Sequence, residues 1–207
     1  MLAQLHLPVQ LNIEEGMKKA VSQKTLTAYK QQGFHLVGIA PFAQYERKMY
    51  PLLKMRAVVK MLLQHSNIKI YLFGGKGDAD ILQQWEAELK GAENCAGKMH
   101  FSDELQTISN LDVMVSMDSA NMHLASMYGV QVVSVWGATH PYAGFYGWGQ
   151  KPQNAVQVDL YCRPCSVFGN KPGPRTDLAC LQNITPLVVY QQVMQVLETT
   201  ENLSVQH

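Results

Sequence analysis

Short apolar runs alternate with longer amphipathic segments along most of the chain, from residue 35 onward. The runs are four to six residues long, rich in Val, Ile and Leu, and most are followed by glycine, proline or aspartate. The longer segments repeat apolar residues every three or four positions, as amphipathic helices do. Strands that alternate with helices in this way build parallel βαβ units. The pattern therefore predicts an α/β fold with a Rossmann-like, doubly wound parallel sheet.

The predicted elements follow one another with short connections. Strands are expected at residues 35–40, 68–73, near 95, and at 113–117, 130–135 and 155–158. Helices are expected at residues 52–64, 78–89, 102–109, 120–128 and 186–198. Pro51 precedes the first helix and Gly129 follows the fourth, as proline and glycine do at helix ends. Residues 138–153, rich in glycine and aromatic residues, predict an ordered loop of the kind that carries function.

Three parts of the chain differ in organisation. Residues 34–200 contain the whole predicted sheet and are expected to form one Rossmann-like domain. Residues 1–33 contain a stretch, rich in Lys and Gln, that fits one amphipathic helix without a strand, so we expect a linker or a remnant helix there. Residues 201–207 are expected to be a tail.

Composition and charge exclude several classes of protein. Of 207 residues, 47% are hydrophobic and 16% are charged, which excludes disorder. Lys and Arg total 17 against 16 Asp and Glu, so the net charge is +1 and nucleic acid is not an expected partner. No run reaches the roughly 18 apolar residues of a membrane-spanning helix. We expect a cytoplasmic protein, including a peripheral position at the inner face of the membrane.

Ligands of doubly wound sheets bind at the carboxyl ends of strands, which directs attention to the turn after residue 117. There the backbone N–H groups of Ser119, Ala120 and Asn121 are expected at a helix N-terminus, with His123 one turn further on. From spacing alone, we prefer an Asp or Ser N-cap followed by a core-facing histidine. The alternative is an anion site made by these amides and the Ser119 hydroxyl.

Two other turns offer weaker signals. Residues 74–78, GGKGD, match neither G-x-G-x-x-G nor the Walker pattern, so they indicate a tight turn capped by Asp78. In the functional alternative, Asp78 or Asp80 accepts hydrogen bonds from ribose hydroxyls. Arg47 and Lys48 follow the first strand and are candidates for the cation of a diphosphate site, against a solvated basic pair.

Three cysteines cluster late in the chain, at Cys162, Cys165 and Cys180. The first two have the spacing of a zinc knuckle, but the loop has no fourth sulfur and no histidine. Reduced thiols packed in the structure are the preferred interpretation, with these cysteines as weak metal candidates. Redox and metal-hydrolase chemistry have little support, because no Ser/His/Asp, Cys/His or His-x-x-x-His arrangement and no carboxylate cluster stands out.

The segments so far described resemble the C-terminal half of a GT-B enzyme of glycosyltransferase family nine, the bacterial lipopolysaccharide heptosyltransferases. Residues 118–125, DSANMHLA, are similar to the family's D-S/T-G-x-x-H-L-A, and residues 135–141 to its F/Y-G-x-T-x-P. Gly38 to Pro41 with Lys48 resembles its first strand and donor-binding lysine. Lys98 and Met99 fall where the family places a backbone contact to adenine, and late cysteines are also common there. The resemblance covers residues 37–197 and reverses our preference at the Asp118 turn.

The resemblance implies a donor domain that binds an ADP-sugar of heptose type. It implies inverting transfer to a lipopolysaccharide-type acceptor, with no cofactor and no divalent metal. Lys48, Asp118, Ser119, Ala120, Asn121 and His123 would bind the diphosphate and sugar, and Asp78 and Met99 the nucleoside. Asp118 would orient sugar hydroxyls or cap the helix.

Two departures from the family pattern shape the expectations. The family's glycine after Asp-Ser/Thr is Ala120, which narrows the room for a phosphate. Residues 1–33 contain nothing that could form the N-terminal domain with the acceptor site and base, so we expect the isolated chain to be inactive. The lipid-linked saccharide would bind through that missing domain, and the exposed interdomain face is a candidate surface for a homo-oligomer. The alternatives are a non-catalytic sugar-nucleotide-binding domain and a zinc-stabilised interaction module.

Overall fold

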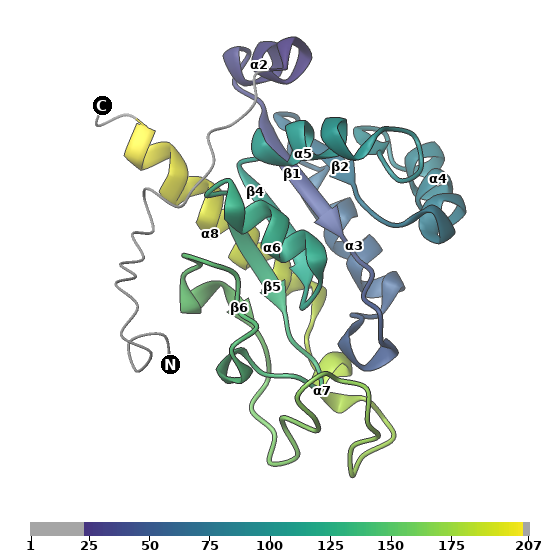
Figure 1. Cartoon of the computed structure of the whole chain (residues 1–207). Helices are drawn as coiled ribbons and strands as arrows, with labels where there is room; N and C mark the ends of the chain where they lie inside the picture. Colours follow the sequence, from purple (N-terminus) through teal and green to yellow (C-terminus); the bar gives the residue numbers. More distant parts are fainter. Residues whose placement is uncertain (1–22, 205–207) are drawn as a thin grey trace, which may run out of the picture.

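The computed structural model describes residues 23–204, with side chains through residue 200. Its centre is a six-stranded parallel sheet in the order β3-β2-β1-β4-β5-β6 (Figure 1). The strands are β1 (His35–Ala40), β2 (Ile68–Leu72), β3 (Ala92–Asn94), β4 (Val113–Met117), β5 (Gln131–Val135) and β6 (Ala155–Val156). The chain starts at β1, moves outward to β3, and returns to place β4 on the other side of β1. This is the predicted doubly wound order, and the fold class is confirmed.

Helices cover both faces of the sheet. One face packs against α3 (Leu52–Leu62), α4 (Ala79–Glu88) and α8 (Pro186–Ser204), and we call it the α3 side. The other face packs against α2 (Lys24–Gln31), α5 (Phe101–Ser109) and α6 (Ala120–Met127), and we call it the α6 side. In Figure 1, α5 and α6 lie in front of the sheet, and α3 and α8 lie behind it. The result is a three-layer α/β/α domain.

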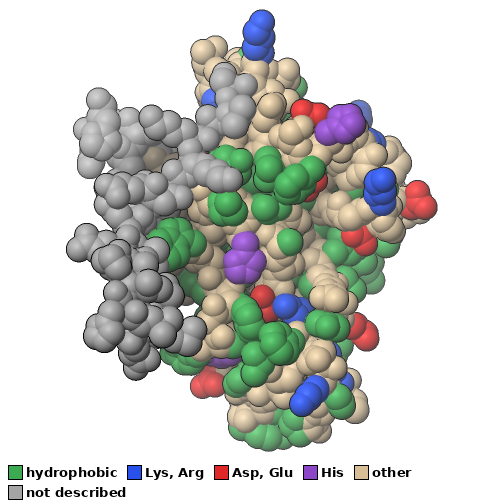
Figure 2. All heavy atoms as spheres, in the orientation of Figure 1, with side chains coloured by type: hydrophobic (Ala, Val, Ile, Leu, Met, Phe, Trp, Pro, Cys, Tyr) green, Lys and Arg blue, Asp and Glu red, His purple; other side chains and the backbone are tan. Residues whose placement is uncertain are grey.

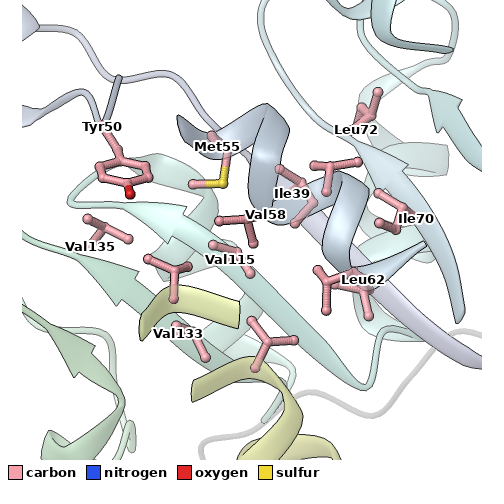
Figure 3. Packing of buried hydrophobic residues seen from close by; sticks show 14 of the residues in the cluster. Ile39, Tyr50, Met55, Val58, Leu62, Ile70, Leu72, Val115, Val133 and Val135 are labelled. Atoms are coloured by element: carbon pink, nitrogen blue, oxygen red, sulfur yellow. The ribbon is translucent and has the colours of Figure 1, made fainter. Parts of the chain in front are cut away.

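The alternation of side chains along the strands builds two cores. In β1, Val37 and Ile39 point to the α3 side, whereas Leu36 and Ala40 point to the α6 side. Figure 3 shows side chains of β1, β2, β4 and β5 meeting Met55, Val58 and Leu62 of α3. Each such fully buried aliphatic side chain contributes about 1.5–3 kcal/mol through removal from water. A hydrophobic core thus stabilises the sheet on both faces, and the strands that carry the turns at its carboxyl edge are held in place by packing.

Some element boundaries differ from the sequence prediction. The strand expected near residue 95 is β3 at Ala92–Asn94, where pairing with β2 outweighs the low strand propensity of Ala and Asn. Helix α8 continues to Ser204, because no proline or glycine follows residue 198 to end it. The short helix α7 (Ala179–Gln182) was not predicted.

Part of the predicted linker belongs to the folded domain. Helix α2 packs on β1, and its Leu26 is buried in the core of the α6 side. The rest of that amphipathic stretch, before residue 23, and residues 205–207 of the predicted tail lie outside the described residues.

The loop after β5 is ordered, as predicted. It contains the short 3₁₀ helix η4 (Pro141–Ala143) and is followed by a second, η5 (Pro152–Asn154). Gln150 joins the loop to the start of β5, since its side chain accepts a hydrogen bond from Val132 N at 2.7 Å and donates to Val130 O at 2.8 Å.

Hydrophobic side chains gather on the face shown in Figure 2, over α5 and α6 and again over the loops below the sheet. Phe101 at the start of α5, Met127 at the end of α6, and Trp148 and Phe168 in the loops are among the exposed large apolar residues. Between residues 23 and 204, no helix has the length and apolar character needed to cross a membrane.

Candidate functional site

A cavity of about 810 Å³ lies at the carboxyl edge of the sheet, where the connections from β1 and β4 lead away in opposite directions. In a doubly wound sheet, this switch point is where ligands bind. Its volume is within the range of about 300–1,000 Å³ that small-molecule sites occupy. Polar residues of the lining follow β1, β2 and β4, and they are Gln44, Lys48, Asp78, Asp118, Ser119, Asn121 and His123.

Lys48 and Asp118 form a largely buried ion pair in the wall of this cavity. Lys48 ends the short 3₁₀ helix η2 (Glu46–Lys48), and its Nζ lies 2.9 Å from Oδ2 of Asp118, with the two side chains 15% and 5% exposed. Thr139, which follows β5, donates a hydrogen bond from Oγ1 to the same carboxylate oxygen at 2.9 Å. The Asp118 carboxylate is thus held by an ammonium and a hydroxyl group.

Helix α6 begins beside this ion pair and points its N-terminus into the cavity. Of the two predicted N-cap candidates, Asp118 and Ser119, the structure has Ser119 at the N-cap position, in an extended conformation and with no side-chain cap hydrogen bond. The Ser119 hydroxyl lies 3.1 Å from the hydroxyl of Ser116. The first amides of a helix have no partner within it and carry a partial positive charge. They therefore suit an anion.

His123 and Ala120 lie on the exposed part of α6. Both line the cavity, so the core-facing interpretation of His123 is wrong and the resemblance gave the better prediction. Asn121 lines the cavity between them in sequence. The structure thus brings together all six residues predicted for the diphosphate and sugar.

Asp78 caps its own turn, as predicted, but its side chain makes no cap hydrogen bond at the start of α4. It ends η3 (Lys76–Asp78), and its Oδ2 accepts a hydrogen bond from Gly75 N at 2.8 Å. It also lines the cavity, at the end of β2, so the capping contact leaves it beside the site.

Two predicted binding residues lie elsewhere. Met99 packs against the core of the α6 side and is not among the residues that line this cavity. Arg47 precedes Lys48, but its Nη1 donates to Arg175 O at 3.4 Å, away from the lining residues. Of the predicted basic pair, Lys48 alone lines the cavity.

The late cysteines lie outside the cavity. Cys162, Cys165 and Cys180 are free thiols, and Cys165 donates a weak hydrogen bond from Sγ to Cys162 O at 3.2 Å. Burial raises the pKa of the Cys165 and Cys180 thiols, which disfavours the thiolates that metals bind. Within the described part of the chain, no three His, Cys, Asp or Glu residues form a group that could hold a metal ion.

The apolar lining of the cavity and Thr139 were not predicted as parts of the site. Phe42 and Phe73 follow β1 and β2, so their position after a strand was a usable signal. Phe145 and Phe168 come from two distant loops, and their rings lie 5.6 Å apart between centroids. No spacing in the sequence predicts the contact between these two rings. The cavity thus offers apolar surface beside a helix N-terminus and an ammonium group, which suits a ligand with a flat ring and an anionic part.

The doubly wound sheet and the cavity at its switch point place the chain among the Rossmann-like domains of GT-B folds. The family model of glycosyltransferase family 9 (heptosyltransferase) matches residues 1–174, and the chain belongs to this family.

Individual relatives agree with this assignment. Lipooligosaccharide heptosyltransferase 2 of Campylobacter jejuni subsp. jejuni serotype O:2 is 26% identical over 136 residues, which cover 63% of this chain and 41% of the relative. The structure of E. coli ADP-heptose lps heptosyltransferase II has a TM-score of 0.65 at 18% identity and covers 87% of this chain and 53% of that one. These 207 residues therefore span about half the length of the proteins they match.

A third similar protein is the dodecameric iron-containing heptosyltransferase TibC of enterotoxigenic E. coli, solved in complex with ADP-D-beta-D-heptose. Its TM-score is 0.63 at 16% identity, and the match covers 94% of this chain and 50% of TibC. At these identities, the solved structures establish the shared fold.

Proposed function

We propose that this chain forms the donor-binding half of a heptosyltransferase-type glycosyltransferase and that the cavity holds an ADP-sugar. The observation that carries the proposal is the meeting of the Lys48 ammonium and the N-terminus of α6 at the switch point of the sheet. Lys48 has three N–H donors and gives one to Asp118, so two remain for phosphate oxygens. The amides after Ser119 are a second, fixed set of donors.

The names of the relatives support a heptose donor and a lipopolysaccharide-type acceptor. The Campylobacter relative is named a lipooligosaccharide heptosyltransferase, and TibC was solved with ADP-D-beta-D-heptose. Because the match covers about half of each relative, the transfer reaction is proposed for the protein of which these residues form the donor half. We expect the 207 residues alone to show no transfer, and a lipid-linked saccharide to bind through the other half.

The proposed reaction is an inverting displacement. An acceptor hydroxyl attacks the anomeric carbon and loses its proton to a base, while the bond from that carbon to the diphosphate oxygen breaks. Negative charge grows on the leaving diphosphate, where Lys48 and the α6 amides would stabilise it. Such stabilisation by fixed donors requires no divalent metal and no cofactor. His123 at the cavity mouth is a further donor toward the diphosphate, and Asp78 is the candidate contact to ribose.

A nucleotide panel tests this proposal on the chain as it is. ADP, UDP and GDP are added at increasing concentration in a thermal unfolding assay, followed by titration calorimetry with the best ligand. A ligand at 100 times its Kd stabilises the native state by about 2.7 kcal/mol, which raises Tm by roughly 5–10 °C in a domain of this size. We expect ADP to give the largest shift. No shift with any diphosphate would reject the donor-site assignment.

Self-association is a separate proposal. The exposed apolar side chains over α5, α6 and the loops would be covered by a second copy, and the dodecameric state of TibC is a precedent in a similar fold. Sedimentation velocity across a range of concentrations would measure it.

A further inference from the structure

We infer that Thr139 and Gly169 are positioning residues that hold the Lys48 ammonium in place for the donor diphosphate. The inference rests on the proposed function, since it concerns how the same cation is fixed. Both residues lie outside the sequence segments that supply the donors themselves. They come instead from the segment after β5 and from residues 161–178, which we call the cysteine loop.

Thr139 acts on Lys48 through Asp118. Its side chain is fully buried, and Oγ1 donates to the Asp118 oxygen that also pairs with Lys48. A carboxylate that accepts from two fixed donors has less freedom to rotate than one with a single partner. Lys48 is the last residue of a three-residue 3₁₀ helix, and its side chain is a long, flexible stem. The position of its ammonium group therefore depends on the Asp118 carboxylate.

Gly169 acts on the stem of Lys48. Its φ is +73°, and a Cβ built there would lie 2.6 Å from Cγ and 2.8 Å from Cδ of Lys48. The same Cβ would lie 3.2 Å from Cγ2 of Thr139. The backbone of Gly169 thus packs so closely against Lys48 and Thr139 that no side chain would fit between them. The cysteine loop therefore limits the positions that the Lys48 side chain can adopt.

Arg163 fixes the cysteine loop to the sheet edge. Its guanidinium donates to Gly137 O at 2.6 Å, to Thr139 O at 3.0 Å and to Trp136 O at 3.3 Å. It also donates to Val158 O and, at 3.1 Å, to the side chain of Gln157. The loop is therefore tied to the same backbone segment that carries Thr139, so the two positioning residues are held as one unit.

The first experiment separates the hydroxyl of Thr139 from its shape. Thr139→Val keeps the volume and removes the donor, whereas Thr139→Ser keeps the donor. ADP affinity is measured by calorimetry on the full chain, with the thermal unfolding midpoint recorded for each variant. We expect the valine variant to bind ADP at least fivefold more weakly and the serine variant to stay within twofold of wild type. A valine variant with lowered Tm and unchanged ADP affinity would show a purely structural role and overturn the assignment of Thr139.

The second experiment uses two glycines with matched backbones. Gly169→Ala places a methyl group against the Lys48 stem, whereas Gly33→Ala, at φ +81°, places it in open space far from the cavity. Both variants carry the backbone strain of a positive φ, and Gly169→Ala adds the contact with the Lys48 stem, so its thermal stability should fall further. We expect Gly169→Ala alone to weaken ADP binding, by tenfold or more. Equal ADP affinity in the two variants would overturn the assignment of Gly169.

The wild-type titration keeps the two proposals apart. A wild-type chain that does not bind ADP overturns the proposed function and this inference with it. A wild-type chain that binds ADP, with variants that bind as tightly, overturns the positioning role alone. If Thr139→Val does not fold, the ADP affinities of Gly169→Ala and Gly33→Ala alone test the positioning role.

Discussion

The ammonium group of Lys48 lies 2.9 Å from the carboxylate of Asp118, and both side chains are largely buried at the N-terminus of α6. The pair is neutral as a unit. A bound diphosphate would therefore meet the helix amides and the remaining N–H groups of Lys48 rather than an isolated positive charge. A substitution in this pair should affect the stability of the chain as well as its binding of a diphosphate. The reason is that removal of either partner leaves the charge of the other buried without a counter-ion.

Lys48→Met and Asp118→Asn should each lower the stability of the chain while preserving its fold. Removal of one partner leaves a buried charge without its counter-ion, at a cost of about 3 kcal/mol. The double variant removes both charges, so its loss should be smaller than the sum of the single losses by at least 1 kcal/mol. Urea unfolding followed by circular dichroism gives the three free energies of unfolding.

Arg47→Met is the matched control for this cycle. It removes a neighbouring charge whose single hydrogen bond, to Arg175 O, is exposed, so its effect on stability should stay within about 0.5 kcal/mol. Additive losses in the Lys48 and Asp118 variants would show that the two charges do not interact in solution.

The sequence predicted the parts of the site that follow a strand directly. A run such as residues 113–117 is identified by its apolar period, and the doubly wound order then places Asp118 and Lys48 on the same edge. Thr139 was visible only as one letter of a family motif, and Gly169 carried no signal. Their contacts join segments about 20 to 120 residues apart, and such pairings depend on how loops close, which no local pattern encodes.

Met99 shows what a motif position leaves open. Its side chain packs on the α6 side, against the core. The family contact to adenine expected at this position is made by the backbone, and the direction of a side chain does not test it. The nucleoside contact at Met99 therefore stays a prediction.

Ala120→Glu should change stability and ADP affinity in opposite directions. A carboxylate in the first turn of a helix interacts favourably with the helix dipole, by about 0.3–1 kcal/mol. In α6, the same carboxylate would occupy the cavity and repel a diphosphate, so ADP binding should fall by tenfold or more. Chemical denaturation and calorimetry measure the two effects separately.

Ser102→Glu provides the comparison on another helix. Ser102 is exposed in the first turn of α5 and does not line the cavity, so this variant should not weaken ADP binding. Undiminished ADP binding in Ala120→Glu would mean that the N-terminus of α6 does not contact the diphosphate.

Gly137→Ala should displace the segment that carries Lys48. A Cβ at Gly137 would lie 2.5 Å from the backbone oxygen of Arg47, which already accepts a hydrogen bond from Ala138 N at 2.9 Å. Backbone atoms cannot rotate away as a side chain does, so η2 must move, at a cost of about 1–3 kcal/mol. We expect weaker ADP binding together with this loss of stability. Gly77→Ala, whose Cβ would meet no atom within 4 Å, should change neither property.

Glu86 should give the chain a component of stability that is lost in acid. Its carboxylate accepts hydrogen bonds from Lys98 Nζ at 2.7 Å, Asn94 N at 2.9 Å and Gln83 Nε2 at 2.8 Å, and the Lys98 contact is the main cause that holds its pKa below the usual range. A carboxyl group with a lowered pKa in the folded state stabilises the protein above its unfolded pKa, about 4.3, and loses that effect as the pH falls through the folded value.

Measurement of unfolding free energies from pH 7 to pH 3 tests this sign, with Glu86→Gln as the variant. Wild type should be more stable than Glu86→Gln by about 0.5–1 kcal/mol near pH 7, because the ion pair is partly exposed. The difference should shrink toward zero below about pH 4.

Burial raises the pKa of Glu104, and this shift changes stability with pH in the opposite sense. The comparison of wild type with Glu86→Gln is therefore needed to isolate the contribution of Glu86. Lys98→Met should remove most of the same pH-dependent component, and a difference that stays constant across the range would show that the Glu86 charge contributes nothing.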